Sequence, residues 1–281
     1  MNIKTRKNDL ILENIECFNV GLSVDCGQAF RWIKKADGSF HGVIFKKAFD
    51  IVQNEKEIVF KNTDEETFKS LLVPYFDLER DYGKICSSFD DGYLQKACKA
   101  YYGIRILHQE EWEALCSFIV SQNNNIGRIK KIIARLCEKF GEPFESGGKI
   151  YYSFPKAETL ACASEIDIFS CGTGFRAKYI SDAAKKVASG EINLESISSL
   201  DDENARAELM KICGVGPKVA NCALLFGFHR LSSFPIDVWI KRVLDKYYKN
   251  GIDLGDLGDY AGVAQQYLFY YERYKNGEEI K

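Results

Sequence analysis

The chain has 281 residues, of which 46% are hydrophobic and 28% are charged, and its formal net charge is −2. This composition is that of a globular protein, so it excludes disordered, collagen-like and low-complexity classes. The near-neutral charge also excludes a uniformly basic nucleic-acid binder, so any polyanion site has to be a local basic patch.

No apolar run approaches the ~20 residues that a membrane-spanning helix needs. Residues 1–10 are rich in charge, with no apolar signal segment behind them. We therefore expect a cytosolic protein without a membrane partner, associated with the nucleoid if its source is prokaryotic.

The cysteines are numerous but widely spaced. Ten are present, and none forms the Cys-x-x-Cys pair that zinc and iron–sulfur sites usually show. Most lie within apolar stretches, which predicts buried free thiols in a reducing compartment and no metal site built from side chains.

Antiparallel sheet is predicted in the first third of the chain. Strands expected at 30–33 and 40–45 flank Asp37-Gly38, a dipeptide typical of hairpin turns. Further strands are expected at 49–52 and 58–60. A capping box at 63–66 then predicts a helix that ends at Pro74.

Helical spacing replaces this alternation from about residue 80. We expect an N-terminal β domain over 1–105 and an all-helical body over 106–281. The clearest predicted helices cover 111–121, 126–140, 175–188, 201–212, 217–227, 237–249 and 259–274.

The turn Gly214-Val215-Gly216 followed by Pro217 is the most informative segment. One helix ends before it, and proline begins the next helix at the position where it is best tolerated. Turn amides without side-chain bulk are able to approach a phosphate closely, aided by the partial charge at the helix N-terminus. The pattern over about 205–227 predicts a helix-hairpin-helix that grips a DNA backbone, with a plain helix–helix corner as the alternative.

Lys218 follows this turn, in the first turn of the new helix, where the helix dipole disfavours a positive charge. Partial burial there favours the neutral amine that a nucleophile requires. Asp237 comes nineteen residues later and is placed to cap the next helix. Taken alone it is a cap, but paired with this lysine it is a candidate catalytic carboxylate.

These two segments resemble the helix-hairpin-helix DNA glycosylase superfamily, and over nearly its whole length the chain is similar to the 8-oxoguanine DNA glycosylase branch. The resemblance implies an α+β fold with a TBP-like N-terminal antiparallel β domain and an all-α glycosylase body. It implies that Lys218 and Asp237 are catalytic, and that Gly214, Val215 and Gly216 contact the DNA backbone.

Two further segments match DNA-contacting segments of that branch. In the stretch 121–128 the resemblance implies that Asn123 fills the hole left by a flipped base and that Arg128 donates to the orphaned cytosine. In the stretch 172–179 it implies that Phe175 wedges beside that cytosine and that Arg176 contacts it. The arginine and lysine residues between positions 176 and 186 would supply the local basic patch.

The base pocket of the family draws on three places in the chain. The resemblance implies that the carbonyl of Gly27 accepts the N7 hydrogen that distinguishes 8-oxoguanine from guanine. It also implies that Cys222 stacks on the base, that Gln265 reads its Watson–Crick edge and that Phe269 closes the pocket. Gln266 is the off-register alternative to Gln265, because it points about 100° away on a helix.

Trp239 departs from the family, whose animal members have histidine at this place. We expect an aromatic packing role for it beside the DNA. None of the three histidines, His41, His108 and His229, falls in a matching catalytic position. Family hairpins often hold a cation on backbone carbonyls, which here would belong to Met210, Ile212 and Val215.

The predicted function is therefore excision of 8-oxoguanine, preferably opposite cytosine, from duplex DNA by a bifunctional glycosylase and lyase. The expected partner is damaged duplex DNA, with no cofactor, no obligate protein partner and a monomeric state. One alternative is a glycosylase of the same fold for other damaged bases. Another is a non-catalytic helix-hairpin-helix DNA-binding protein.

Overall fold

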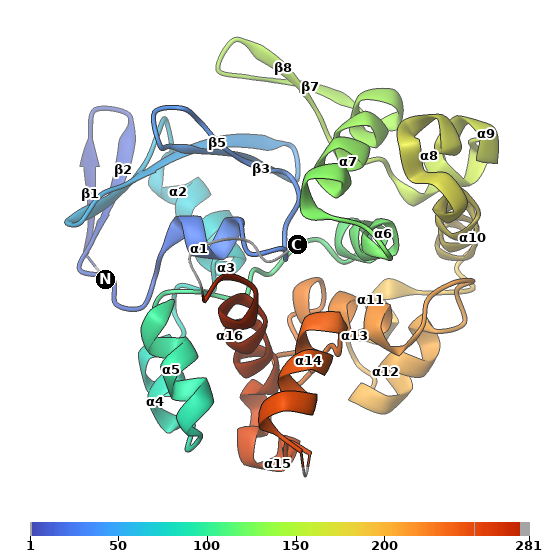
Figure 1. Ribbon diagram of the computed structural model, residues 1–281. Helices are drawn as coiled ribbons and strands as arrows, with labels where there is room; N and C mark the ends of the chain where they lie inside the picture. Colours follow the sequence, from blue (N-terminus) through green and yellow to red (C-terminus); the bar gives the residue numbers. More distant parts are fainter. Residues whose placement is uncertain (1, 250, 276–281) are drawn as a thin grey trace.

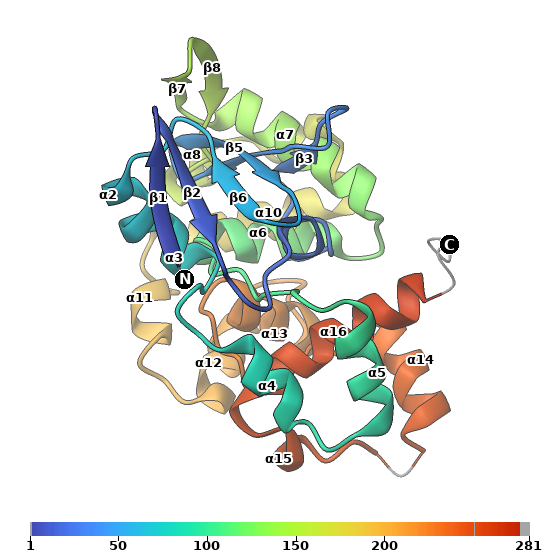
Figure 2. The ribbon, with the colours of Figure 1, turned by 90° about the vertical axis from the view of Figure 1, so that its left-hand side faces the viewer.

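A computed structural model describes residues 2–249 and 251–275. Within these residues the chain forms an antiparallel six-stranded sheet in the order β1-β2-β6-β5-β4-β3, followed by a helical body (Figures 1 and 2). No helix of this part of the chain has the length and apolarity to cross a bilayer. The strands are β1 (Asn2–Arg6), β2 (Asp9–Glu13), β3 (Trp32–Lys34), β4 (Phe40–Ile44), β5 (Lys47–Gln53) and β6 (Glu57–Phe60).

The predicted hairpin is confirmed. Strands β3 and β4 pair from Trp32 opposite Gly42 to Lys34 opposite Phe40. The loop between them has Gly38 in the left-handed region at φ 85°, and Asp37 accepts a hydrogen bond from the Ser39 amide at 3.0 Å. Strands β5 and β6 also form as predicted, whereas β1 and β2 were not expected.

The helix predicted to end at Pro74 ends at Tyr75, one residue later. The N-cap of α2 (Glu65–Thr67) is Asp64 and not Thr63. The Asp64 side chain accepts a hydrogen bond from the Thr67 amide at 2.7 Å. A π-helical turn, η1 (Phe68–Leu72), then leads into α3 (Val73–Tyr75). Pro74 lies in the first turn of α3, where its missing N–H costs little, so the helix is able to continue past it to Tyr75.

The helical body contains the predicted helices, with ends that differ by a few residues. Its elements are α4 (Tyr82–Ser88), α5 (Gly92–Ala100), α6 (Glu111–Ser121), α7 (Ile126–Phe140), α8 (Ala157–Cys162), α9 (Glu165–Ile168), η2 (Phe169–Thr173), η3 (Gly174–Arg176), α10 (Ala177–Ala188), α11 (Leu194–Ile197), α12 (Asp202–Leu209), α13 (Pro217–Phe226), α14 (Val238–Tyr247), α15 (Leu254–Leu257), η4 (Gly258–Tyr260) and α16 (Ala261–Tyr274). An unpredicted hairpin of β7 (Pro143–Ser146) and β8 (Lys149–Tyr152) projects from the body, and α1 (Val20–Val24) lies under the sheet (Figure 1).

Two hydrophobic cores divide the molecule. One lies between the sheet and the helices over residues 64–75, and the other fills the helical body. Helices α4 and α5 contribute Ile85 and Leu94 to the second core, although they precede the predicted domain boundary at 105. That boundary stays a prediction. Helix α16 packs between α5 and α14, so this helix completes the core of the body (Figure 1).

The ten cysteines are free, and eight of them are buried as expected, whereas Cys162 and Cys213 are exposed. Burial raises the pKa of several thiols, for example Cys26 and Cys137 to about 12. These thiols therefore act as small apolar side chains of the cores.

Helix α6, which carries part of the site, is joined to the sheet through buried charge. Arg31 and Glu113 form an ion pair at 3.2 Å that is largely shielded from solvent. Glu110 lies beside it at the start of α6, close to Tyr75 and to residues 43–45 of the sheet. Burial, reinforced by the charge of Glu113, raises the pKa of Glu110 to about 7.

We expect Glu110→Gln to stabilise the protein above neutral pH. Since an ordinary glutamate has a pKa of 4.5, the unfolded chain ionises first, and the wild type loses stability as the pH rises from 4.5 to about 7. The variant escapes this loss, a gain of about 1–3 kcal/mol at pH 8 that vanishes at pH 4.5. Urea unfolding at both pH values measures it. An equal difference at the two pH values would contradict the assignment.

Candidate active site

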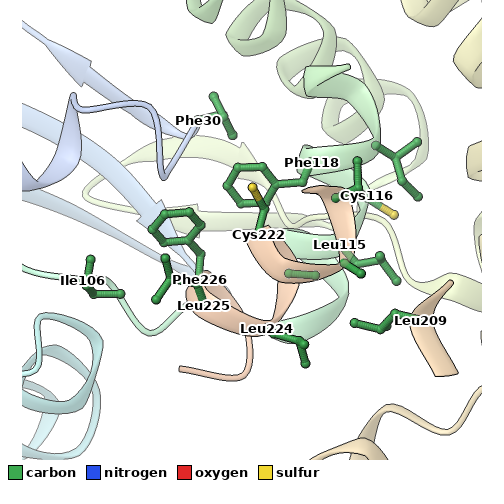
Figure 3. Close-up of a cluster of buried hydrophobic side chains, with 14 of the residues drawn as sticks. Phe30, Ile106, Leu115, Cys116, Phe118, Leu209, Cys222, Leu224, Leu225 and Phe226 are labelled. Carbon is green, nitrogen blue, oxygen red and sulfur yellow. The ribbon is translucent and has the colours of Figure 1, made fainter. Parts of the chain in front are cut away.

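The amine of Lys218 lies at the end of helix α6. Lys218 is half-buried in the first turn of α13, and its Nζ donates a hydrogen bond to the Ser121 hydroxyl at 3.2 Å. The same nitrogen is 5.5 Å from the centroid of the Phe118 ring. Helices α13 and α6 are held together by stacking of Phe118 on Phe226, with ring centroids 5.2 Å apart (Figure 3). Packing of these two helices therefore sets the position of the amine.

Asp237 caps α14, as predicted. Its Oδ1 accepts from the amides of Trp239 and Ile240 at 2.9 and 2.8 Å. Burial raises the pKa of Asp237 above its ordinary value, although the two amides and the nearby charge of Lys218 oppose this effect. The structure thus places a partly desolvated carboxylate near enough to the amine for the two charges to interact, as expected of a catalytic pair.

Cys222 lies one helical turn after Lys218 and faces the same region. Its side chain is buried beside the Phe118 ring, on the inner side of α13 (Figure 3). Burial raises the pKa of the thiol to about 11, a shift that the charge of Lys218 reduces and that of Asp237 increases. The thiol is therefore neutral at physiological pH and offers an apolar, polarisable surface beside the amine.

Gly27 and Phe269 meet, although 242 residues separate them in the sequence. Gly27 has a φ of 83°, and a Cβ placed on it would lie 3.2 Å from Ile126 Cδ1 and 3.6 Å from the Phe269 ring. A side chain at position 27 would thus be strained, would press on Ile126 and would touch the aromatic ring. The structure brings together these two residues of the predicted pocket.

Hydrogen bonds fix the residues on both sides of Gly27. The Cys26 carbonyl accepts from Gln266 Nε2 at 3.0 Å, and the Gln28 carbonyl accepts from Gln109 at 2.8 Å. Gln28 itself is fully buried and donates to the Arg105 carbonyl at 2.7 Å. The backbone around Gly27 is therefore rigid, as a recognition element requires.

Hydrogen bonding distinguishes the two glutamines that are candidates for reading the base, Gln265 and Gln266. Gln266 is used to hold the Cys26 carbonyl. Gln265 is 4% exposed, and no described residue donates to its Oε1. An unpaired buried amide oxygen is costly, so it is expected to find its partner in a bound molecule. This geometry favours Gln265 as the residue that reads a ligand.

The Gly-Val-Gly hairpin is docked on α10. A Cβ at Gly214, which has a φ of 77°, would lie 2.5 Å from the Tyr179 ring. The Cys213 amide donates to Asp182 at 2.7 Å, and Lys186 Nζ donates to the Lys211 carbonyl at 2.6 Å. The hairpin and the basic side of α10 therefore form one surface.

Alanine at the two glycines of the hairpin is expected to give different results. Gly214→Ala places a methyl group 2.5 Å from atoms of the Tyr179 ring. It should destabilise the fold by about 1–3 kcal/mol as well as weaken DNA binding. Gly216 has a φ of −99°, and a Cβ there meets no atom within 4 Å. Gly216→Ala should therefore weaken DNA binding without lowering the melting temperature. Thermal unfolding and binding to a labelled duplex measure both effects, and an equal loss of stability in the two variants would contradict the docking described above.

The remaining predicted DNA contacts gather around the turn before α7. Asn123 is exposed with a φ of 46°, and Asn125 rather than Asn123 caps α7, accepting from the Arg128 amide at 2.9 Å. Phe175 is 51% exposed and packs edge-on against Tyr179 at 5.9 Å. An exposed aromatic beside an exposed amide suits insertion between bases.

Arg176 is placed differently from the prediction. It is 2% exposed, and its guanidinium donates to the Gln122 carbonyl at 2.8 Å, to the Asn123 carbonyl at 2.9 Å and to the Thr173 carbonyl at 3.1 Å. These bonds occupy most of its donors, so in this conformation Arg176 holds the 122–123 turn in place. Its contact with an opposite base stays a prediction, as does that of the exposed Arg128.

Trp239 is half-buried and packs against a cation, with the Arg242 guanidinium 4.5 Å from the ring centroid. In the hairpin the Ile212 carbonyl accepts from the Val215 amide at 3.0 Å, and Met210 is exposed. A cation at the carbonyls of Met210, Ile212 and Val215 stays a prediction. Among the described residues, no group of three or more His, Cys, Asp and Glu side chains is placed to hold a metal ion.

Two site residues were missed in the sequence. Ser121 is the first residue of the stretch 121–128, but nothing in the sequence assigned it a role. Arg273 lies one turn beyond Phe269, with its guanidinium 5.8 Å from that ring, and its charge lowers the pKa of Asp237. The only sequence signal for Arg273 was its spacing of four residues from Phe269 and eight from Gln265, which places the three on one helical face.

The docked Gly-Val-Gly hairpin, the Lys218 amine near the half-buried Asp237, and the contact between Gly27 and Phe269 are features of a helix-hairpin-helix protein of DNA base excision. Family models agree: residues 10–115 match the N-terminal domain of 8-oxoguanine DNA glycosylase, and residues 116–252 match the HhH-GPD superfamily of base excision DNA repair proteins. The chain belongs to the 8-oxoguanine DNA glycosylase branch of that superfamily.

Individual relatives give the same assignment. An N-glycosylase/DNA lyase of Saccharomyces cerevisiae is 34% identical over 86% of this chain and 69% of its own length. The structure of the Clostridium acetobutylicum 8-oxoguanine glycosylase/lyase, in complex with duplex DNA containing cytosine opposite 8-oxoguanine, superposes with a TM-score of 0.91 at 41% identity, covering 98% of this chain and 99% of that one. The structure of MBOgg1 with a low-affinity DNA ligand gives a TM-score of 0.92 at 44% identity, with 98% and 99% covered.

Proposed function

We propose that the protein excises 8-oxoguanine from duplex DNA, preferably opposite cytosine, and then cleaves the strand at the abasic site. The observation that carries the proposal is the position of the Lys218 amine, which lies at the end of α6, near the half-buried Asp237 and directly after the docked hairpin. The Gly27–Phe269 contact and the unpaired oxygen of Gln265 support a pocket for a flipped base. Such an enzyme works where the chromosome lies, which in a prokaryote is the nucleoid.

The chemistry proceeds on the sugar. Neutral Lys218 attacks C1′ as the bond between C1′ and the base breaks, and the departing base takes up a proton. Asp237 stabilises the positive charge that develops on the sugar. The C1′–O4′ bond then breaks as Nζ loses a proton and O4′ gains one, which gives a Schiff base between Nζ and C1′. Loss of a proton from C2′ breaks the C3′–O bond, and the phosphate leaves as the 5′ end of the downstream strand.

The pocket selects the base before this step. Flipping costs a few kcal/mol, which wedge and pocket contacts recover. The Gly27 carbonyl would accept the N7 hydrogen of 8-oxoguanine, where guanine presents a lone pair. An acceptor left facing another acceptor costs at least ~1–3 kcal/mol, so undamaged guanine is rejected.

The test uses four labelled duplexes: 8-oxoguanine opposite cytosine, 8-oxoguanine opposite adenine, a 3-methyladenine analogue and undamaged DNA. Release of free base and strand nicking are followed under single-turnover conditions. We expect both on the first duplex, less on the second and none on the other two. Release from the alkylated duplex alone would favour a same-fold glycosylase for other bases, and binding without release from any duplex would favour a non-catalytic protein.

A further inference from the structure

The partner of the Lys218 amine in the folded protein is a hydroxyl. Ser121 is the last residue of α6, and its Oγ accepts from Lys218 Nζ at 3.2 Å across 97 residues of sequence. This contact joins the end of one helix to the first turn of α13. It places the amine on the α6 side of the site, over the Phe118 ring.

The direction of this hydrogen bond follows from a second one. Ser121 Oγ also lies 2.8 Å from the Phe118 carbonyl, which has only lone pairs to offer. The single hydroxyl proton therefore goes to that carbonyl, and the lone pairs of Oγ face Lys218. The hydroxyl is thus oriented as an acceptor for the amine before DNA arrives.

An anchor of this kind matters because of the neighbouring carboxylate. A lysine side chain is a flexible four-carbon stem with a point charge, so in the absence of another partner it is drawn towards Asp237. Asp237 Oδ1 already accepts two amides and stays fixed at the start of α14. An amine paired directly with this carboxylate would be held as an ammonium ion, which has no free lone pair for attack on C1′.

We propose that Ser121 is a positioning residue, which holds the Lys218 amine between α6 and the Phe118 ring and so aligns it for attack on C1′. The inference rests on the proposed function, since it assigns to Ser121 a part in both lysine-dependent steps. Those steps are base excision and formation of the Schiff base at an abasic site. A residue of the base pocket would affect only the first.

The test measures single-turnover rates of Ser121→Ala on two duplexes, one with 8-oxoguanine opposite cytosine and one with a preformed abasic site. Because misplacing a reacting group by about 1 Å costs up to about 100-fold, we expect both rates to fall about ten- to hundredfold and by the same factor. Binding of the damaged duplex should not change. Ser121→Thr, which keeps the hydroxyl, should restore both rates.

Two further variants separate positioning from folding. Ser121→Cys keeps the size of the side chain with a much weaker acceptor, so it should be as slow as Ser121→Ala. Ser88 is the last residue of α4 and donates to the Ile85 carbonyl at 2.8 Å, the same helix-end bond far from the site. Ser88→Ala should therefore leave both rates at the wild-type value.

Each outcome decides between the assignments. Unchanged rates in Ser121→Ala, loss of base excision alone, or a slow Ser121→Thr would overturn the positioning role. A wild-type enzyme inactive on 8-oxoguanine but reactive at the abasic site would instead reject the proposed substrate. The abasic duplex would then still test Ser121.

Discussion

Replacing Lys218 by glutamine is expected to abolish strand nicking and the covalent adduct that borohydride traps, while binding of the damaged duplex persists. Removing a nucleophile typically costs more than about 10⁴-fold in rate. Glutamine keeps two of the four methylene groups of lysine and a polar end without a reactive amine. The fold and the hairpin should therefore be preserved, and only the reactive nitrogen is lost.

Lys178→Gln is the matched control for this variant. Lys178 is an exposed lysine of α10, with its Nζ 5.3 Å from the Tyr179 ring on the surface that carries the hairpin. Its loss should weaken DNA binding and reduce the salt dependence of binding, while bound enzyme still forms the adduct. An adduct of undiminished yield in Lys218→Gln would show that another amine is the nucleophile.

Asp237→Asn is expected to slow base excision by about 10²–10³-fold, the usual loss on removing an electrostatic stabiliser, without lowering stability. Asparagine caps helices about as well as aspartate, so the bonds to the Trp239 and Ile240 amides persist. Since burial raises the pKa of Asp237, its charge is unfavourable in the folded state at neutral pH. The neutral variant should thus unfold at the same temperature or slightly higher.

The pH dependence gives a second readout for Asp237. As the pH falls, the raised pKa protonates this carboxyl sooner than an ordinary aspartate, so the wild-type rate should decline at a higher pH than 3.8 would imply. The residual rate of Asp237→Asn should lack this acid limb. Asp237→Ala, which also loses the cap, should cost about 1 kcal/mol of stability. A variant Asp237→Asn with the wild-type rate would contradict the catalytic role.

The chemistry of this chain was predictable from sequence where it depends on local pattern. The Gly-Val-Gly turn, the lysine after it and the capping aspartate are each defined within a few residues, and the structure places them as expected. Strand β1 was missed because Asn2–Arg6 is a largely exposed edge strand, whose charged side chains hide any apolar alternation. Pro74 did mark the end of its helix to within one residue, since α3 ends at Tyr75.

Other features depended on contacts that no local pattern contains. Ser121 meets Lys218 only because α6 and α13 pack together, and nothing near residue 121 announces the distant amine. Arg176 carries the residue type of a base reader, but its partners are carbonyls 53 and 54 residues away. Burial of this kind is a property of the assembled fold. Sequence periodicity alone therefore could not tell whether Arg176 bonds to the protein backbone or contacts DNA.

The hydrogen bond from Gln266 to the Cys26 carbonyl joins residues 240 apart in the sequence. Contacts between residues so far apart in the sequence are expected to form late in folding, because closing the long loop between them costs conformational entropy. The hairpin on α10 joins residues only 31 apart through the bond from Cys213 to Asp182. A refolding chain is therefore expected to recover DNA binding before it recovers discrimination between damaged and undamaged bases. These two activities should return with separate time constants.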